Sequence, residues 1–282
     1  MATTTVEPGA AGLAQLPPAS GRAGIAGALR SEFTKIRSVR STYWTLLALL
    51  VVSIGIGAAI TAGTAAHWNQ MAPGDQATFD STQASLGGLF YLGQLVIVVL
   101  GALVLTAEYS TGMIRTSLTS MPRREIVFVA KAVVFGLVSL VVTFAAAFVS
   151  FYLGQALMSS THHAATLSQP NVLRAIVGSA LYVSVCGMFA YAVGALLRHT
   201  AGTITAVIGL LFVVPIIAHL LPNSWFWDIH RWLPSAAGEA LSTTVGPQPA
   251  HLFPPWGQFA VLCVYTAVLL VIGGVLFLRR DA

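Results

Sequence analysis

Few residues of this chain have the types and spacing needed for catalysis. Neither of the two lysines, Lys35 and Lys131, follows a glycine, so the phosphate-binding motif G-x-x-x-x-G-K-[ST] of many ATPases is absent. His162 and His163 are adjacent, but no third ligand accompanies them and the zinc motif H-E-x-x-H is missing. We therefore expect that this chain is not an enzyme and has no catalytic residue, cofactor or metal of its own.

The composition indicates a membrane protein. Hydrophobic residues make up 56% of the 282 residues and charged residues only 8%, against roughly 25% charged in an ordinary soluble domain. The formal net charge of +5 is too small in so apolar a chain to form a basic face, which excludes a nucleic-acid partner. Cys186 and Cys263 lie far apart in apolar runs, so we expect both to be packing residues.

Six uncharged runs are long enough to cross a bilayer, because a spanning helix needs about 20 apolar residues. The sequence therefore predicts an all-α polytopic membrane protein with six transmembrane helices. A transporter driven by an ion gradient usually needs a charged group at membrane depth, and no run contains one. The predicted spans are Tyr43–Ala66, Leu86–Ala107, Ala132–Met158, Ala175–Leu197, Ala201–Leu221 and Gly257–Leu278.

The distribution of basic residues predicts the orientation, since cytoplasmic loops retain Lys and Arg. With the N-terminus inside, twelve basic residues are cytoplasmic and only Arg174 and Arg231 are outside. We therefore expect a multi-pass protein of the plasma membrane with both termini in the cytoplasm. The third span is long, and we expect its first turns, with Glu125 and Lys131, to project into the cytoplasm.

The chain before the first span divides into two predicted segments. The sequence of residues 1–24 predicts a disordered cytoplasmic tail. Residues 25–42 predict an amphipathic helix at the membrane surface, because apolar residues recur every 3 or 4 positions from Ile25 to Tyr43. Two charged residues fall on or beside the apolar stripe, so the helix either anchors to lipid alone or also contacts protein. Its candidate residues are Glu32, Lys35, Arg37 and Arg40.

Two loops are also predicted to contain helices. In the cytoplasmic loop 108–124, Ile114, Leu118 and Met121 give a short helix one narrow apolar face. This face must pack on the bundle or on another protein, and the pattern favours neither. In the outer segment 222–256, Pro and Trp residues bracket a helical stretch, which predicts one or two short helices that re-enter the outer leaflet.

Small residues recur at four-residue spacing in the first and fifth spans, which lets helices approach closely. This spacing fits packing within one bundle as well as a homodimer interface. The candidate residues are Gly55, Ala59, Gly63, Gly202, Ala206 and Gly209.

Both cytoplasmic segments resemble those of ABC-2-type transporter permeases, the transmembrane subunits of bacterial type V ABC exporters. In that family a Glu, a Gly and a stretch ending in Pro and basic residues form a coupling helix that contacts the ATPase. Met113 follows the glycine here, where many members have Thr. The matching residues are Glu108, Gly112, Arg115, Leu118 and Pro122.

The resemblance implies a permease that exports an amphipathic or lipid-like substrate. It also implies a second permease copy, identical or related, whose first and fifth spans face those of this chain, and a separate dimer of ATPase subunits that holds ATP and Mg. The alternative is a membrane subunit that does not transport, with an anchoring, sensory or immunity role. In that case the loop helix packs only on its own bundle.

Overall fold

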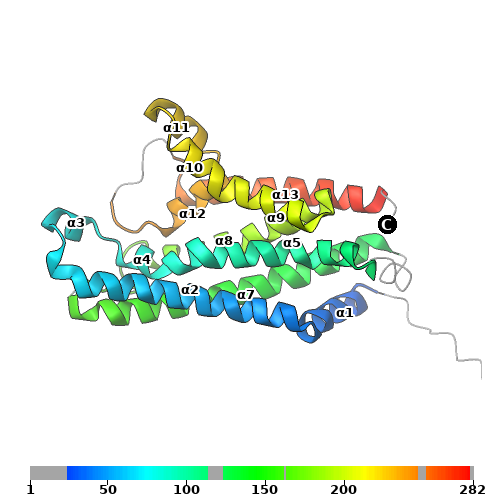
Figure 1. The fold of residues 1–282 in the computed structure, drawn as a ribbon, viewed down its shortest axis with the longest axis horizontal. Coiled ribbons are helices and arrows are strands. Elements are labelled where there is room, and N and C mark those ends of the chain that lie inside the picture. Colours follow the sequence, from blue (N-terminus) through cyan, green and yellow to red (C-terminus); the bar gives the residue numbers. More distant parts are fainter. Residues whose placement is uncertain (1–23, 114–122, 162, 247–251, 280–282) are drawn as a thin grey trace, which may run out of the picture.

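The computed structural model describes residues 24–113, 123–161, 163–246 and 252–279, and these residues form an elongated bundle of helices without a strand (Figure 1). The predicted tail, residues 1–24, lies almost entirely outside them. The two ends of the described chain, α1 and the last turn of α13, lie at the same end of the bundle, whereas α3 and α11 lie toward the other end.

Six apolar helical stretches of the described chain are long enough to span a membrane, as predicted. Most extend beyond the predicted runs because a helix continues through polar residues at its ends. The third stretch contains α7, whose 35 residues are about 52 Å long at ~1.5 Å per residue. Its first two turns hold Glu125 and Lys131, as predicted. The stretches are Arg40–Gln70, Ser81–Ser110, Arg124–Thr161, Val172–Leu197, Thr200–Ala218 and Pro255–Arg279.

The elements follow one another as short and long helices. The first half comprises α1 (Ile25–Ser38), α2 (Arg40–His67), η1 (Trp68–Gln70), α3 (Pro73–Thr78), α4 (Ser81–Gly88), η2 (Leu89–Gly93) and α5 (Gln94–Ser110). The second half comprises α7 (Arg124–Met158), η3 (Ser159–Thr161), α8 (Val172–Leu197), α9 (Thr200–Ile208), η4 (Gly209–Val213), α10 (Val214–Ala218), α11 (Asn223–His230), α12 (Pro234–Ser242) and α13 (Pro255–Arg279).

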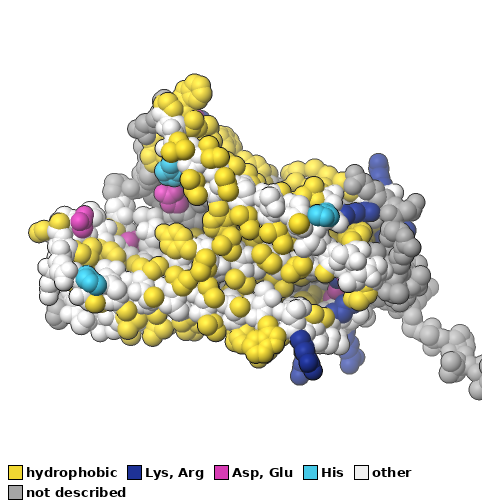
Figure 2. Space-filling view, in the orientation of Figure 1, with side chains coloured by type: hydrophobic (Ala, Val, Ile, Leu, Met, Phe, Trp, Pro, Cys, Tyr) yellow, Lys and Arg dark blue, Asp and Glu magenta, His cyan; other side chains and the backbone are white. Residues whose placement is uncertain are grey.

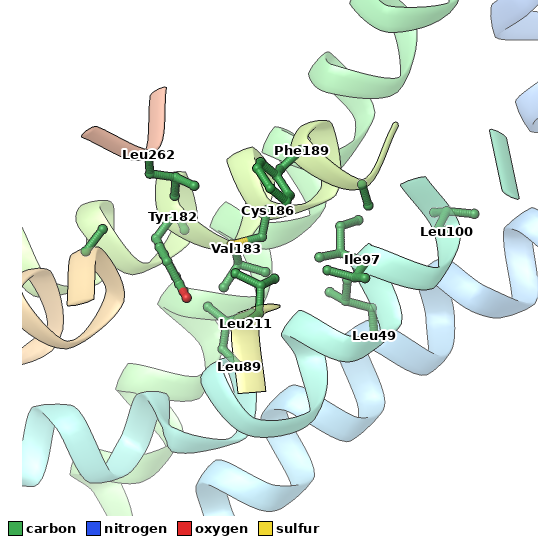
Figure 3. Packing of buried hydrophobic residues seen from close by; sticks show 14 of the residues in the cluster. Leu49, Leu89, Ile97, Leu100, Tyr182, Val183, Cys186, Phe189, Leu211 and Leu262 are labelled. Carbon is green, nitrogen blue, oxygen red and sulfur yellow. The ribbon is translucent and has the colours of Figure 1, made fainter. Parts of the chain in front are cut away.

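Helix α8 forms the centre of the bundle, between α5, α7 and α13. In its most apolar stretch 67% of residues are buried, against 22% in α2 and in α13. A side chain at Gly101 of α5 would overlap the backbone of Gly187 in α8, so the two helices are in contact along their backbones. Figure 3 shows the apolar side chains around this contact, among them Ile97, Val183 and Phe189.

Polar side chains inside the bundle bond one helix to another, as expected for uncharged polar residues at membrane depth. The Gln94 amide donates to the Tyr182 hydroxyl at 3.0 Å, which joins α5 to α8. The Gln155 amide donates to the Ser85 hydroxyl at 2.9 Å, which joins α7 to α4. These bonds help to orient helices whose contacts are mostly apolar.

The second and fifth stretches each contain a π-helical turn, η2 and η4. The fifth also contains Pro215, and a proline cannot donate the backbone hydrogen bond of a helix. The π turn ends at Val213, two residues before this proline.

Helix α1 contacts the bundle through residues beside its apolar stripe, Glu32 among them. Ala28 and Glu32 are its buried residues and pack toward α7. Ile25 and Phe33 of the apolar stripe are each 54% exposed. The helix ends at Ser38 and α2 begins at Arg40, three residues before Tyr43, the predicted start of the first span.

The described part of the segment between the fifth and sixth stretches contains two short helices, α11 and α12, and the sequence predicted one or two there. Helix α12 begins at Pro234, a favourable first helical residue, and packs with buried Ala236, Ala237 and Leu241 between α8 and α13. The His230 ring of α11 is bonded to the Glu239 carboxylate of α12 at 2.9 Å. That these helices enter the outer leaflet stays a prediction.

Candidate functional site

Four charged side chains from three helices meet at the end of the bundle where α1 lies. Glu32 and Lys35 come from α1, Glu108 from the end of α5 and Lys131 from the second turn of α7. The Lys131 Nζ atom lies 2.7 Å from Glu32 Oε2 and 2.7 Å from Glu108 Oε1. The Lys35 Nζ atom lies 2.7 Å from Glu32 Oε1 and 3.1 Å from Glu108 Oε1. Each carboxylate therefore contacts both ammonium groups, and we call these four residues the ion cluster.

The helical geometry explains why these side chains converge. Glu32 and Lys35 are three residues apart on one face of α1, so both point to the same neighbours. Glu32 is 6% exposed, Glu108 5% and Lys131 4%. Two negative and two positive charges cancel, which is the condition under which charges can be buried without a large electrostatic cost.

The environment of Lys35 keeps its ammonium group charged. Burial by itself lowers the pKa of Lys35, but the hydrogen bond with Glu32 and the negative charge of Glu108 outweigh burial and raise this pKa above its ordinary value. Lys35 is therefore protonated at neutral pH. Its side chain is 31% exposed, so it forms the solvent-facing edge of the ion cluster.

Further contacts tie the end of α5 to the rest of the bundle. The Arg198 guanidinium lies 4.9 Å from the centre of the Tyr109 ring and donates to the Leu276 carbonyl at 3.1 Å. The Tyr191 hydroxyl donates to the Phe128 carbonyl at 3.0 Å. Helices α5, α7, α8 and α13 are thus connected at the same end of the molecule as the ion cluster.

The structure brings together three of the predicted site residues, Glu32, Lys35 and Glu108. Glu108 was expected to act through a cytoplasmic contact, whereas its carboxylate lies inside the bundle. Gly112 follows α5 with φ of +70°, a conformation that favours glycine, and Arg37 and Arg40 are exposed beside the cluster. The other coupling candidates, Arg115, Leu118 and Pro122, lie outside the described residues.

Lys131 was not among the predicted site residues. Two signals could have identified it: it is one of only two lysines, and it directly precedes an apolar run of 27 residues. A lysine next to such a run needs a carboxylate partner if it is buried, and Glu32 and Glu108 were the unexplained acidic residues near other spans.

The small residues of the first span face away from the bundle. Gly55, Ala59 and Gly63 are exposed, and a side chain at Gly55 or Gly63 would meet no atom within 4 Å. The opposite face of α2, with Ser53, Gly57 and Thr61, packs inside the bundle instead. In the fifth span Ala206 is exposed and Gly202 and Gly209 are half-buried. Packing within this chain therefore does not account for the exposed stripe of α2.

A comparison with known protein families identifies the family of this chain. The sequence model of a family described as "ABC-2 family transporter protein" matches residues 28–216, about two thirds of the chain. The chain belongs to the ABC-2 transporter family. All four residues of the ion cluster lie within the match. No curated protein matches the chain in a comparison of sequences. With its six apolar helices, this ABC-2 family member is a multi-pass membrane protein, a transporter permease.

The described part of this ABC-2 permease holds no cluster of three or more His, Cys, Asp or Glu side chains that could bind a metal. The ion cluster joins α1, α5 and α7, so it can transmit force between these helices.

Proposed function

We propose that this chain is the permease subunit of an ABC exporter, driven by separate ATPase subunits that bind ATP and Mg. The observation that supports this proposal best is the position of the ion cluster. It joins α1 to the end of α5 and the start of α7, and these last two helices flank the loop predicted to hold the coupling helix. A force on that loop would move all three helices together.

In this proposal the ATPase subunits supply the energy and the permease supplies the two conformations. ATP can drive the change only if the ATP-bound dimer binds one conformation more tightly than the other. Residues Arg115, Leu118 and Pro122 contact the ATPase, with Glu108 and Gly112 positioning the loop from its bundle side. Exposed Arg37 and Arg40 of the α1–α2 junction lie beside this contact.

The arrangement of basic residues supports the proposed orientation. All described Lys and Arg residues except Arg174 and Arg231 belong to α1, the α1–α2 junction, the start of α7 or the ends of α8 and α13. Figure 2 shows Lys and Arg gathered at the α1 end of the visible face, which is otherwise largely apolar. We place this end in the cytoplasm.

The exposed small residues of α2 support a second permease copy. Gly55, Ala59 and Gly63 form an outward-facing stripe without side-chain bulk, which suits close contact with another helix. We propose that this stripe and the fifth span face a partner permease across the transport pathway. The apolar surface of both helices suits an amphipathic or lipid-like substrate.

The experiment that tests this proposal identifies the proteins that co-purify with the tagged chain from its native membrane. We expect a protein with its own G-x-x-x-x-G-K-[ST] motif in near equal amount. Leu118→Glu should abolish this association, because it places a charge on the narrow apolar face of the loop. Leu167→Glu, between α7 and α8 at the opposite end of the bundle, is the matched control and should not affect it.

Absence of such an ATPase in several mild detergents would contradict the proposal and favour the subunit that does not transport. Equal loss of the ATPase in the Leu118 and Leu167 variants would contradict the assignment of the loop.

A further inference from the structure

A pocket of about 270 Å³ lies between the α1–α2 junction and α5. Its wall is mostly apolar, with Ile36, Leu103 and Val104 among its residues. Its polar edge includes Lys35, Glu108 and Lys131 of the ion cluster and the hydroxyl residues Ser41 and Thr42 in the first turn of α2. The pocket thus combines a hydrocarbon-like interior with a polar rim.

The rim is electropositive. Glu108 is the acidic residue among those that line the pocket, and its charge is balanced by Lys131 at 2.7 Å. Lys35 also lines the pocket, but its charge is balanced by Glu32 at 2.7 Å. The excess positive charge therefore comes from Arg37 and Arg40, which are exposed on either side of Val39, another lining residue. From Phe33 to Tyr43 the sequence contains no acidic residue. The ligand that complements this rim is an anion.

Aromatic residues beside the pocket mark the depth at which it would lie in a membrane. Tyr43 is 62% exposed and Trp44 is 64% exposed, on the turn of α2 that follows Ser41 and Thr42. Exposed Tyr and Trp side chains favour the headgroup layer, where one edge of the ring is wet and the other is apolar. Ser41, Thr42 and Arg40 therefore lie at the level of the lipid phosphates. The apolar wall with Leu103 and Val104 lies deeper in the bilayer.

We propose that this pocket binds one anionic phospholipid from the adjacent leaflet. The phosphate accepts hydrogen bonds from Ser41, Thr42 and Arg40, and part of an acyl chain covers Leu103 and Val104. A soluble phosphate would leave the apolar wall uncovered, and a zwitterionic lipid would bring its ammonium group against the basic rim. Because the lipid contacts residues of the ion cluster, its binding also stabilises α1 against the bundle.

The experiment measures lipid retention by native mass spectrometry of the purified full chain, with dioleoyl phosphatidylglycerol or dioleoyl phosphatidylcholine added. We expect one phosphatidylglycerol molecule per chain, bound about tenfold more tightly than phosphatidylcholine, because more than one basic side chain lies at the rim. Inorganic phosphate should not displace it. Equal retention of the two lipids, or displacement by inorganic phosphate, would overturn the proposal.

Two pairs of variants locate the lipid. Leu103→Trp fills the apolar part of the pocket and should lower phosphatidylglycerol retention about fivefold. Its control is Val51→Trp, at an exposed position of α2 outside the pocket lining, which should not lower retention. Arg40→Gln should reduce the preference for phosphatidylglycerol about fivefold, whereas Arg279→Gln at the end of α13 should not. If test and control variants behave alike, the lipid binds elsewhere and the proposal is wrong.

This inference is independent of the proposed export function, because lipid retention is measured on the permease without an ATPase. Failure to bind phosphatidylglycerol leaves the co-purification test unaffected, and absence of an ATPase leaves the lipid measurement unaffected.

Discussion

At the scale of single residues, the ion cluster is the feature that distinguishes this bundle from a set of apolar helices. Three of its four side chains are almost fully buried, and they come from segments up to 99 positions apart. Removing one member of a buried ion pair leaves its partner uncompensated, which costs about 3–5 kcal/mol in soluble proteins. The cluster should therefore determine whether α1 stays attached to the bundle.

Lys131→Met should be strongly destabilising, because it leaves Glu32 and Glu108 with Lys35 as the remaining cation of the cluster. We expect the melting temperature to fall by about 10 °C. The fully buried Cys186 permits the measurement, since a thiol-reactive dye reaches it when the protein unfolds. Lys35→Met is the comparison and should have less than half this effect, because the Lys35 side chain is 31% exposed and water can replace it. Equal and small effects of both changes would contradict the role of the cluster.

Glu239 supplies a pH-dependent contact between α11 and α12. The hydrogen bond with His230 lowers the pKa of Glu239 below its ordinary value, against the opposing effect of burial. A carboxyl group with a lowered pKa contributes stability above the ordinary Glu pKa of about 4.3, and this contribution is lost as the pH falls through the folded-state value. The side chain is 55% exposed, so the contribution is small.

Glu239→Gln should therefore lower the melting temperature by about 1–2 °C at pH 7, and the difference from the wild type should shrink as the pH falls below the ordinary Glu pKa of about 4.3. Glu125→Gln, an exposed carboxylate at the start of α7, serves as the control for general charge effects. A difference for Glu239→Gln that persists at low pH would show that the contact does not depend on ionisation.

The residue-level site could be predicted only in part. Glu32 was recognised as a charge on the apolar side of α1, and Glu108 as part of the loop motif. Their convergence on Lys131 could not be predicted, because helical periodicity shows which residues share a face but not which helix lies opposite. In a membrane protein lipid can cover an apolar stripe, so the stripe of α1 did not identify the face that contacts protein.

At the scale of elements, close approach of backbones holds α2 against the α4–η2 region. A side chain at Gly88 would overlap the carbonyl oxygen of Ser53, and one at Gly57 would overlap the carbonyl oxygen of Ser85. Small residues are needed at these positions because the helices are in backbone contact. The sequence showed that the first span has closely spaced small residues. Gly55 and Gly57 lie about half a helical turn apart, on opposite faces of α2. Only the packing partner shows which of the two faces is internal.

Gly88→Ala should destabilise the bundle by about 1–3 kcal/mol, because the added methyl group forces α2 and α4 apart. Thermal unfolding with the same dye measures this effect. Gly55→Ala is the matched control: its methyl group meets no atom within 4 Å, and alanine is the better helix former. Destabilisation by both changes in equal measure would indicate that Gly55 also lies in a packed interface, as a permease dimer would provide.

At the scale of the whole molecule, the six-helix architecture follows from hydropathy, since every spanning helix needs about 20 apolar residues. The order of helices around α8 does not follow from it, because all six stretches are similarly apolar, with mean hydropathy between 1.9 and 2.7. Their arrangement depends on a few specific contacts, such as Gly101 with Gly187 and Gln94 with Tyr182. The ion cluster supplies such a contact at the end that carries most of the charge.

In the proposed function, the ion cluster transmits movement between an ATPase and the helices of this permease. Hydrogen–deuterium exchange of the complex, with and without ATP and vanadate, tests it most directly. We predict that backbone exchange changes together in α1 (Ile25–Ser38) and in the first two turns of α7 when nucleotide is trapped, and that Lys131→Met abolishes the change in α1. A nucleotide-dependent change confined to the ATPase, with α1 and α7 unaffected, would contradict the account.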